Sequence, residues 1–165
     1  MSFKIFKNFF LLNLLLVLSI FLFDRFSKIY VIYLDKKFFG SDIYSSKFLN
    51  ITLIWNEGIA FGLFSFKDKD IYNIFTILIL LIILFKFFMI IKSKGLERYA
   101  LSMILGGALG NVFDRILYKR VPDFLDFHIG NFHWFIFNIA DIFITIGVIF
   151  MIIIEIISTN KQKKV

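Results

Sequence analysis

Four long apolar stretches divide the chain, and each contains at most one charged residue: 9–23, 71–91, 99–113 and 134–154. A helix rises about 1.5 Å per residue, so roughly 20 residues cross a hydrocarbon core of about 30 Å. Each stretch reaches that length once its flanks are added. The pattern therefore predicts four transmembrane helices, over about residues 9–33, 71–91, 98–116 and 134–157, with external segments over about 35–70 and 117–133.

The first external segment carries a β-strand signal. Apolar residues alternate over residues 48–55, ending at Trp55, and Asn56-Glu57-Gly58 follows as a turn signal. The run over residues 59–66 is short, apolar and aromatic, so we expect it to lie in the membrane interface.

The second external segment predicts a hairpin. Residues 124–129 and 132–135 flank Gly130-Asn131, which is a two-residue turn signal. In that register His128 faces His133 across the two strands.

The composition also favours a membrane protein. The chain has 165 residues, of which 59% are hydrophobic, against about 45–50% apolar residues in soluble domains. The absence of cysteine excludes disulfides, a thiol nucleophile and a thiolate zinc site. The net charge of +7 lies in short clusters at the ends of apolar runs, so we expect no nucleic-acid partner. The expected fold is an all-α membrane protein, a bundle of four transmembrane helices with a small external β or interfacial element, in one domain over residues 1–165.

Basic residues indicate the orientation. Four spans place both termini on one side, and the lysines at Lys4 and Lys7, in the loop at 92–98 and in the tail at 161–164 favour the cytoplasm for that side. Basic residues within 35–70 count against this assignment. A cleavable signal peptide is the alternative for the first stretch, but no small-residue cleavage site follows, so we expect an uncleaved anchor.

Polar residues gather near one end of the predicted spans. An ionisable group inside a membrane is costly and is a functional hypothesis by default. The predicted topology brings three clusters to the external side: Asp24, Arg25 and Lys28; Asn111, Asp114 and Arg115; Asn138 and Asp141. Gly106, Gly107 and Gly110 share helix faces with the second cluster. Glycines at this spacing more often serve helix packing alone, but here their neighbours are polar.

Five ordered motifs resemble those of the lipoprotein signal peptidase family, the bacterial type II signal peptidases. They run from residue 24 to residue 141 and so cover nearly the whole predicted membrane domain. They are Asp24-x-x-Ser27-Lys28, Asn56-x-Gly58-x-Ala60-Phe61-Gly62, Gly106-Gly107-Ala108-x-Gly110-Asn111-x-x-Asp114-Arg115, Val121-x-Asp123-Phe124-x-Asp126 and Phe137-Asn138-x-Ala140-Asp141.

The resemblance implies an aspartyl endopeptidase of the bacterial cytoplasmic (inner) membrane, which cleaves prolipoproteins before the diacylglyceryl-modified cysteine. It implies that Asp123 and Asp141 are the catalytic pair. The supporting residues that it implies are Asp24, Lys28, Asn56, Gly107, Asn111, Asp114, Arg115 and Asn138. Pro122 departs from the pattern; it removes one backbone donor and favours an extended conformation at the preceding residue.

The residues themselves lead to similar chemistry. Without cysteine, a Gly-x-Ser-x-Gly elbow or a His-Glu-x-x-His motif, a carboxylate pair is the simplest means of amide hydrolysis. Two aspartates a few ångströms apart share one proton. Asp114 is the rival member, but we expect adjacent Arg115 to hold it ionised and structural. Asn138, three residues before Asp141, shares its helix face and is expected to orient its carboxylate.

The sequence also suggests what the protein binds. A substrate with two acyl chains needs apolar surface at the outer leaflet, so Phe61 and Trp55 are candidates for a substrate clamp. We expect diacylglyceryl-prolipoprotein substrates and membrane lipid as partners, no cofactor, and a monomer. Because no ligand spacing lies nearby, we expect no metal and interpret His128 and His133 as interfacial polar tips.

Two other function classes remain open. A small transporter or proton-conducting subunit would also carry intramembrane charges, but it predicts polar residues through the whole membrane depth. A non-enzymatic assembly factor would explain the glycine-rich faces, but not Asp123 and Asp141. Incubation with a lipid-modified precursor separates these classes.

Overall fold

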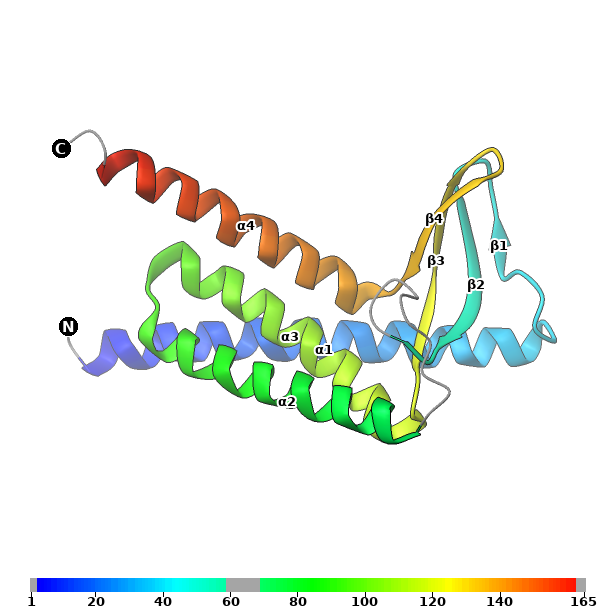
Figure 1. Ribbon diagram of the computed structural model, residues 1–165, viewed down its shortest axis with the longest axis horizontal. Helices are drawn as coiled ribbons and strands as arrows, with labels where there is room; N and C mark the ends of the chain where they lie inside the picture. Colours follow the sequence, from blue (N-terminus) through cyan, green and yellow to red (C-terminus); the bar gives the residue numbers. More distant parts are fainter. Residues whose placement is uncertain (1–2, 59–68, 163–165) are drawn as a thin grey trace.

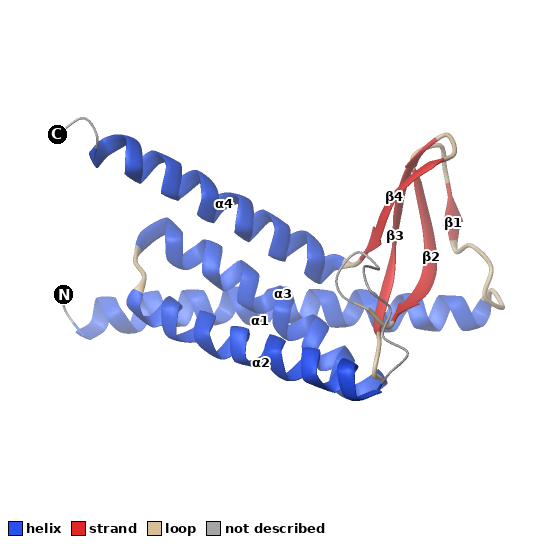
Figure 2. Cartoon of the chain, in the orientation of Figure 1, coloured by secondary structure: helices blue, strands red, loops and turns tan. Residues whose placement is uncertain are grey.

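The computed structural model describes residues 3–58 and 69–162. It has an elongated helical body with a small sheet at one end (Figures 1 and 2). We call this the sheet end; the terminal end is the opposite one, where the first helix begins and the last helix ends. The expected interfacial run over 59–66, including Phe61, lies outside the described residues. In chain order the elements are α1 (Phe3–Lys37), β1 (Tyr44–Ser45), β2 (Leu49–Asn56), α2 (Lys69–Lys92), α3 (Gly95–Tyr118), β3 (Val121–Ile129), β4 (Phe132–Phe137) and α4 (Ile139–Gln162).

Helix α3 is the centre of the helical body. The other three helices all pack against it, and α1 and α2 each contact α3 far more than they contact one another over the described residues. Glycines allow this close packing. A Cβ atom on Gly106 would lie 2.9 Å from Cβ of Ile20 in α1, and a Cβ atom on Gly147 in α4 would lie 2.7 Å from the carbonyl oxygen of Ala100. Small residues therefore bring α1 and α4 against α3, as in many membrane helix pairs.

Three helices are long and apolar enough to cross a membrane among the described residues: Tyr72–Lys92, Gly95–Tyr118 and Ile139–Asn160. Helix α1, at 35 residues, is longer than a bilayer core requires. Over its described residues α1 is not among the helices apolar enough to be a candidate span, and its apolar stretch runs into the charged residues Asp24, Arg25 and Lys28. Three of the expected spans are thus supported, and a membrane crossing by α1 stays a prediction.

The strands form one antiparallel sheet in the order β1-β2-β3-β4. The expected hairpin is confirmed: His128 pairs with His133, and Gly130 turns the chain at φ 58°. The sheet also joins the two external segments, because β2 pairs with β3 and Asn56 lies opposite Val121. The expected helical membrane fold with a small external β element is confirmed in outline, and a bundle of four transmembrane helices stays a prediction. Pairing between the two external segments was not predicted, since pairing between distant segments leaves no local signal.

The last helix begins later than expected. The sequence analysis placed its start near residue 134, but β4 continues to Phe137 and α4 begins at Ile139. An unbroken apolar run covers both elements, so hydropathy alone does not separate them. The boundary is set by a capping box: the Asn138 side-chain oxygen accepts a hydrogen bond from the Asp141 amide at 3.1 Å, and the Asp141 carboxylate accepts one from the Asn138 amide at 3.2 Å.

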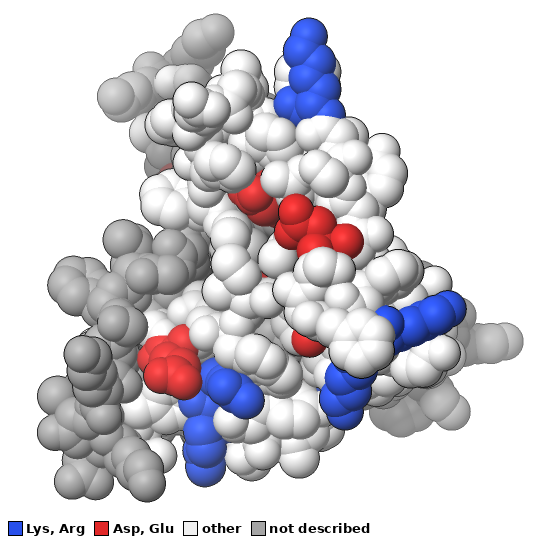
Figure 3. Space-filling model, turned by 90° about the vertical axis from the view of Figure 1, so that its right-hand side faces the viewer, with Lys and Arg blue, Asp and Glu red and all other residues white. Residues whose placement is uncertain are grey.

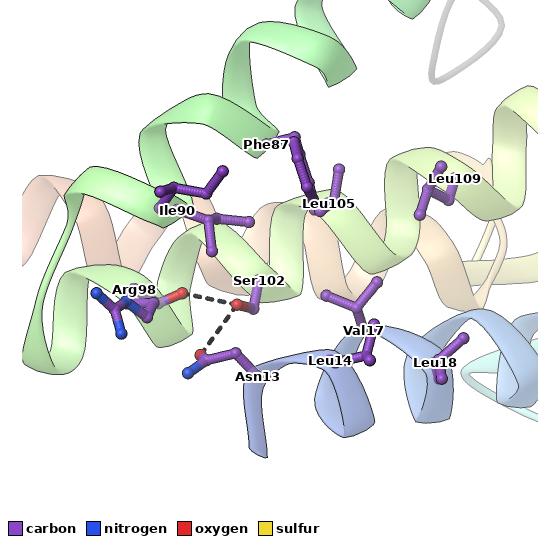
Figure 4. Close-up of a pocket in the computed structure, with 11 residues that line it drawn as sticks. Asn13, Leu14, Val17, Leu18, Phe87, Ile90, Arg98, Ser102, Leu105 and Leu109 are labelled. Carbon is purple, nitrogen blue, oxygen red and sulfur yellow. Dashed lines mark hydrogen bonds between the residues drawn. The ribbon is translucent and has the colours of Figure 1, made fainter. Parts of the chain in front are cut away.

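A cavity of about 470 Å³ lies near the terminal end, between α1, α2 and α3 (Figure 4). Most of its lining is apolar, including Val17, Phe87 and Leu105. Its polar edge holds Ser102, whose hydroxyl lies 3.1 Å from the side-chain oxygen of Asn13 and 2.8 Å from the Arg98 carbonyl oxygen. Apolar contacts therefore dominate the helix packing at this end.

Candidate active site

Asp123 and Asp141 come together where the sheet meets the helices. Asp123 lies on β3 and is 2% exposed, and Asp141 lies in the first turn of α4 and is 5% exposed. They share a neighbour, Asn138, which is fully buried between β4 and α4. The side-chain nitrogen Nδ2 of Asn138 donates to Asp123 Oδ1 at 2.6 Å. The capping box joins the backbone amide and the side-chain oxygen of Asn138 to Asp141. One asparagine thus fixes the relative position of the two carboxylates.

Each aspartate also accepts a hydrogen bond from a second asparagine. Asn56, at the end of β2, donates to Asp123 Oδ2 at 2.8 Å. Asn111 on α3 donates to Asp141 Oδ1 at 2.8 Å, and its own side-chain oxygen accepts from Asn138 at 3.2 Å. These asparagine amides orient both carboxylates without adding a charge beside them.

Behind these amides lies a buried ionic cluster of Asp24, Arg25, Lys28 and Asp114. The Lys28 ammonium, with a fully buried side chain, lies 2.9 Å from Asp24 and 2.8 Å from Asp114, and it donates to Asn111 at 2.8 Å. Arg25 pairs with Asp114 through its two terminal guanidinium nitrogens, at 2.5 and 2.7 Å. Two cations therefore balance two carboxylates, as buried charges require.

The expected partner of Asp114 was wrong, and its structural role stays a prediction. Its carboxylate pairs with Arg25 and Lys28 of α1. Arg115 instead donates to the Gly58 carbonyl oxygen at 2.7 Å and lies over the Tyr72 ring at 5.5 Å. Successive helix residues point in different directions, so residues i and i+1 do not face each other. The sequence analysis placed Arg25 in a polar cluster but not among the supporting residues. Its role could not be predicted because its partner, Asp114, lies on a different helix.

Two glycines of α3 leave space for this arrangement. A Cβ atom on Gly107 would lie 2.5 Å from the Ala140 carbonyl oxygen, and one on Gly110 would lie 2.4 Å from Asp24 Oδ2. Asp24 in turn accepts a hydrogen bond from the Ala140 amide at 3.0 Å. The expected supporting role of Gly107 is therefore consistent with close contact between α3 and the start of α4.

The electrostatics of Asp123 suit proton transfer. Burial, and after it the neighbouring Asp141 charge, raise the pKa of Asp123 from 3.8 to about 7, against the lowering effect of the Asn56 and Asn138 hydrogen bonds. The group therefore holds a proton through much of the range below neutral pH.

A cavity of about 520 Å³ adjoins the pair. Its polar end is lined by Asn56, Asn111 and the two aspartates, and its walls include Ile79, Ile144 and Val148 from α2 and α4. The cavity therefore combines apolar walls with a polar end, as ligand sites commonly do.

Of the two candidates for a substrate clamp, the structure describes only Trp55. Trp55 lies on β2, where the Arg120 guanidinium is 4.3 Å from its ring centroid and the Tyr118 ring is 5.3 Å away. Phe61 lies outside the described residues. Their role in substrate binding stays a prediction.

Comparison with known proteins identifies the family of the chain. The model of the family described as signal peptidase (SPase) II matches residues 16–157. A lipoprotein signal peptidase of Pelagibacter ubique is 53% identical over 156 residues, covering 94% of this chain and 93% of the relative. One of Anaplasma phagocytophilum is 40% identical over 136 residues, covering 81% and 84%.

Two solved structures of bacterial membrane enzymes share the fold. A bacterial membrane enzyme determined by the in meso method at 2.3 Å resolution superimposes with a TM-score of 0.72 at 35% identity, covering 91% of this chain and 90% of that one. A second, at 1.9 Å resolution, has a TM-score of 0.64 at 36% identity, covering 86% and 90%. From the family match over most of its length, together with these relatives, the chain belongs to the signal peptidase II family of membrane proteases.

Proposed function

We propose that the protein is an aspartic endopeptidase that removes signal peptides from diacylglyceryl-modified prolipoproteins by cleaving before the lipidated cysteine. The observation that carries the proposal is the placement of Asp123 and Asp141 on either side of Asn138, with each carboxylate hydrogen-bonded to it. Family membership supports the substrate class, because the relatives are named lipoprotein signal peptidases.

In the proposed reaction the pair shares one proton. The ionised carboxylate removes a proton from water as the water oxygen attacks the scissile carbonyl carbon, and the neutral carboxyl gives its proton to the carbonyl oxygen. Proton transfer to the amide nitrogen then allows the C–N bond to break. The products are the signal peptide with a new carboxyl group and the lipoprotein with a new amino group. Water is the only co-reactant, so the proposed step needs no metal or cofactor.

The supporting residues act through the carboxylates. Asn56 and Asn138 hold Asp123, and Asn111 holds Asp141. Lys28 holds Asn111 in turn and offsets negative charge near the pair. Because these groups are packed in place before substrate binds, they need little reorganisation during the reaction.

The cavity beside the pair is the proposed path for the substrate. Its apolar walls suit the apolar segment of a signal peptide, and its polar end brings the scissile amide to the aspartates. In the proposed orientation both termini are cytoplasmic and the sheet end faces the outer leaflet of the bacterial cytoplasmic membrane. Diacylglyceryl chains then stay in the bilayer while the peptide bond meets water.

The test uses the purified full-length protein in detergent with a synthetic diacylglyceryl-peptide. Asp123→Asn and Asp141→Asn keep the size and hydrogen bonding of the side chain but remove the titratable proton. Each should lower product formation per folded molecule by about 10⁴-fold or more. Asp42→Asn, at an exposed carboxylate beside the sheet, is the matched control and should leave turnover unchanged. Substantial cleavage by either variant of the pair would overturn the proposed role of that residue.

A further inference from the structure

Three other polar side chains gather on the sheet, away from the groups that hold the aspartate pair. Asp126 and His128 are two residues apart on β3 and so share one face, and His133 on β4 pairs directly with His128. One possible ligand atom from each lies within 4.8 Å of the other two. We propose that Asp126, His128 and His133 bind a divalent transition-metal ion of the Zn²⁺ class. This proposal does not rest on the proposed protease function.

The side chains need only small movements to coordinate an ion. Nδ1 of His133 lies 3.0 and 2.9 Å from the two carboxylate oxygens of Asp126. The two imidazole rings stack with centroids 5.0 Å apart. Zinc holds nitrogen and oxygen ligands at about 2.0–2.2 Å, which puts neighbouring ligand atoms about 3.3 Å apart in a tetrahedron. The side chain of His133 is 52% exposed, so its ring can rotate toward a shared ion.

A buried nitrogen points to a missing partner. Nδ1 of His128 is inaccessible to solvent and makes no hydrogen bond among the described residues. A buried polar atom without a partner costs free energy, so such atoms in native structures need an explanation. A metal ion, or a group that the ion orders, would satisfy this ring.

The carboxylate already has an outer partner. Asn50 lies opposite Asp126 on β2 and donates to its Oδ2 at 3.3 Å. Metal ligands are usually oriented by such second interactions. Two imidazoles and one carboxylate form a ligand set that suits zinc and leaves a fourth position for water.

The metal would join the two strands that lead to the aspartate pair. Asp123 lies three residues before Asp126 on β3, and β4 leads directly into Asn138. An ion bridging these strands would stabilise the hairpin, so we assign it a structural effect and no part in peptide cleavage. The sequence analysis expected no metal because it placed only the two histidines together. It did not consider Asp126, although the expected strand over residues 124–129 already placed Asp126 on the same face as His128.

Metal binding can be measured directly on the purified full-length protein. The protein carries no histidine tag, is stripped with a chelator and is titrated with Zn²⁺ by calorimetry and with Co²⁺ by visible absorption. We expect one saturable site per chain, Co²⁺ bands typical of a site with protein ligands, and a higher melting temperature with Zn²⁺.

His128→Ala and His133→Ala should each remove the saturable site, the Co²⁺ bands and the thermal shift. Asn50→Ala should weaken Zn²⁺ binding by about 10-fold or more, because it removes an outer partner of a ligand. Asp42→Asn, an exposed carboxylate outside the cluster, is the control and should bind like the parent protein.

Melting of each metal-free variant checks that it is folded, and exposed His133 offers the mildest substitution. The proposal is overturned if the parent protein shows no saturable site. It is equally overturned if folded His133→Ala binds Zn²⁺ as tightly as the parent.

Discussion

The sheet end and the terminal end of the helical body are held together differently. At the sheet end α1 and α3 are joined by buried charges, with Lys28 paired to both Asp24 and Asp114. At the terminal end the same two helices border an apolar cavity, where Asn13 and Ser102 form a polar contact (Figure 4). Buried charged side chains thus join the helices beside the carboxylate pair, whereas mostly apolar contacts join them at the terminal end.

The charged cluster is a costly way to hold two helices. Burying an ion pair takes two charges from water, and the gain is often no larger than that of a well-packed apolar contact. In this protein the cluster also positions the carboxylate pair, because Lys28 donates to Asn111, which in turn donates to Asp141. Seen from the sheet end, charged side chains occupy a few separate patches on a mostly uncharged surface (Figure 3). The buried cluster therefore differs from the surface charges in both environment and effect.

The largest difference between the two ends should appear in turnover. Asp123→Asn and Asp141→Asn should each lower turnover by about 10⁴-fold or more, and the double variant should be little worse than either single variant, because residues that act as a unit are not additive. Product formation per folded molecule measures this. Two losses that multiply in the double variant would show that the aspartates act independently.

Removal of one charge from the cluster should mainly lower stability. Asp114→Asn leaves Arg25 and Lys28 with Asp24 as their remaining acidic partner in the cluster. Breaking a buried pair in this way costs about 3–5 kcal/mol. We expect a lower melting temperature, with measurable turnover in the folded fraction.

The charge-balanced variant Arg25→Met/Asp114→Asn tests the reason for that loss. If uncompensated charge is the cause, the double variant should be more stable than Asp114→Asn alone. If the stability losses of Arg25→Met and Asp114→Asn simply add in the double variant, uncompensated charge is not the cause of the loss.

Sequence reasoning succeeded where the signal was local. The turn at Gly130-Asn131 and the alternation before Trp55 predicted strands that the structure contains. The motifs also named residues that the fold brings together around Asn138. The capping box at Asn138 and Asp141 was itself a readable signal for the start of α4, and it was missed because the apolar run began earlier.

The rest depended on contacts between distant segments. No local pattern shows that Arg25 reaches Asp114, or that β2 pairs with β3. The neighbour in the sequence, Arg115, was the wrong partner for Asp114 because the helix turns its side chain toward Gly58. Such partners follow only from the packing of whole elements.

The pH dependence of kcat/KM tests whether the aspartate pair shares one proton. The pKa of Asp123 is raised to about 7, so its proton is lost as the pH rises through neutrality. A pair that needs one shared proton should then lose kcat/KM by about tenfold per pH unit above about 7. The profile is measured with the synthetic substrate at constant ionic strength, and a flat profile up to pH 9 would contradict a shared proton.

The same shift affects stability in a defined direction. The folded state binds the Asp123 proton more tightly than the unfolded chain, whose carboxyl titrates near 3.8. This group therefore lowers the free energy of unfolding as the pH rises from about 4 to about 7, and adds no further change above that range. Asp123→Asn removes the effect, so its stability relative to the parent should increase over the same interval.

The smallest effect is expected at the terminal end. Ser102→Ala removes the hydroxyl that lies 3.1 Å from the Asn13 side-chain oxygen, but it leaves the apolar lining of the cavity in place. Hydrogen bonds between membrane helices contribute about 0.6 kcal/mol on average, so the loss of stability should be about 1 kcal/mol or less. Turnover per folded molecule should not change, because Ser102 contacts neither the aspartates nor their asparagine partners in the described structure. Thermal melting and the peptide assay on one preparation measure both quantities. A clear loss of turnover in Ser102→Ala without a loss of folded protein would show that the two ends are coupled, and would overturn their separation into a reactive end and a packing end.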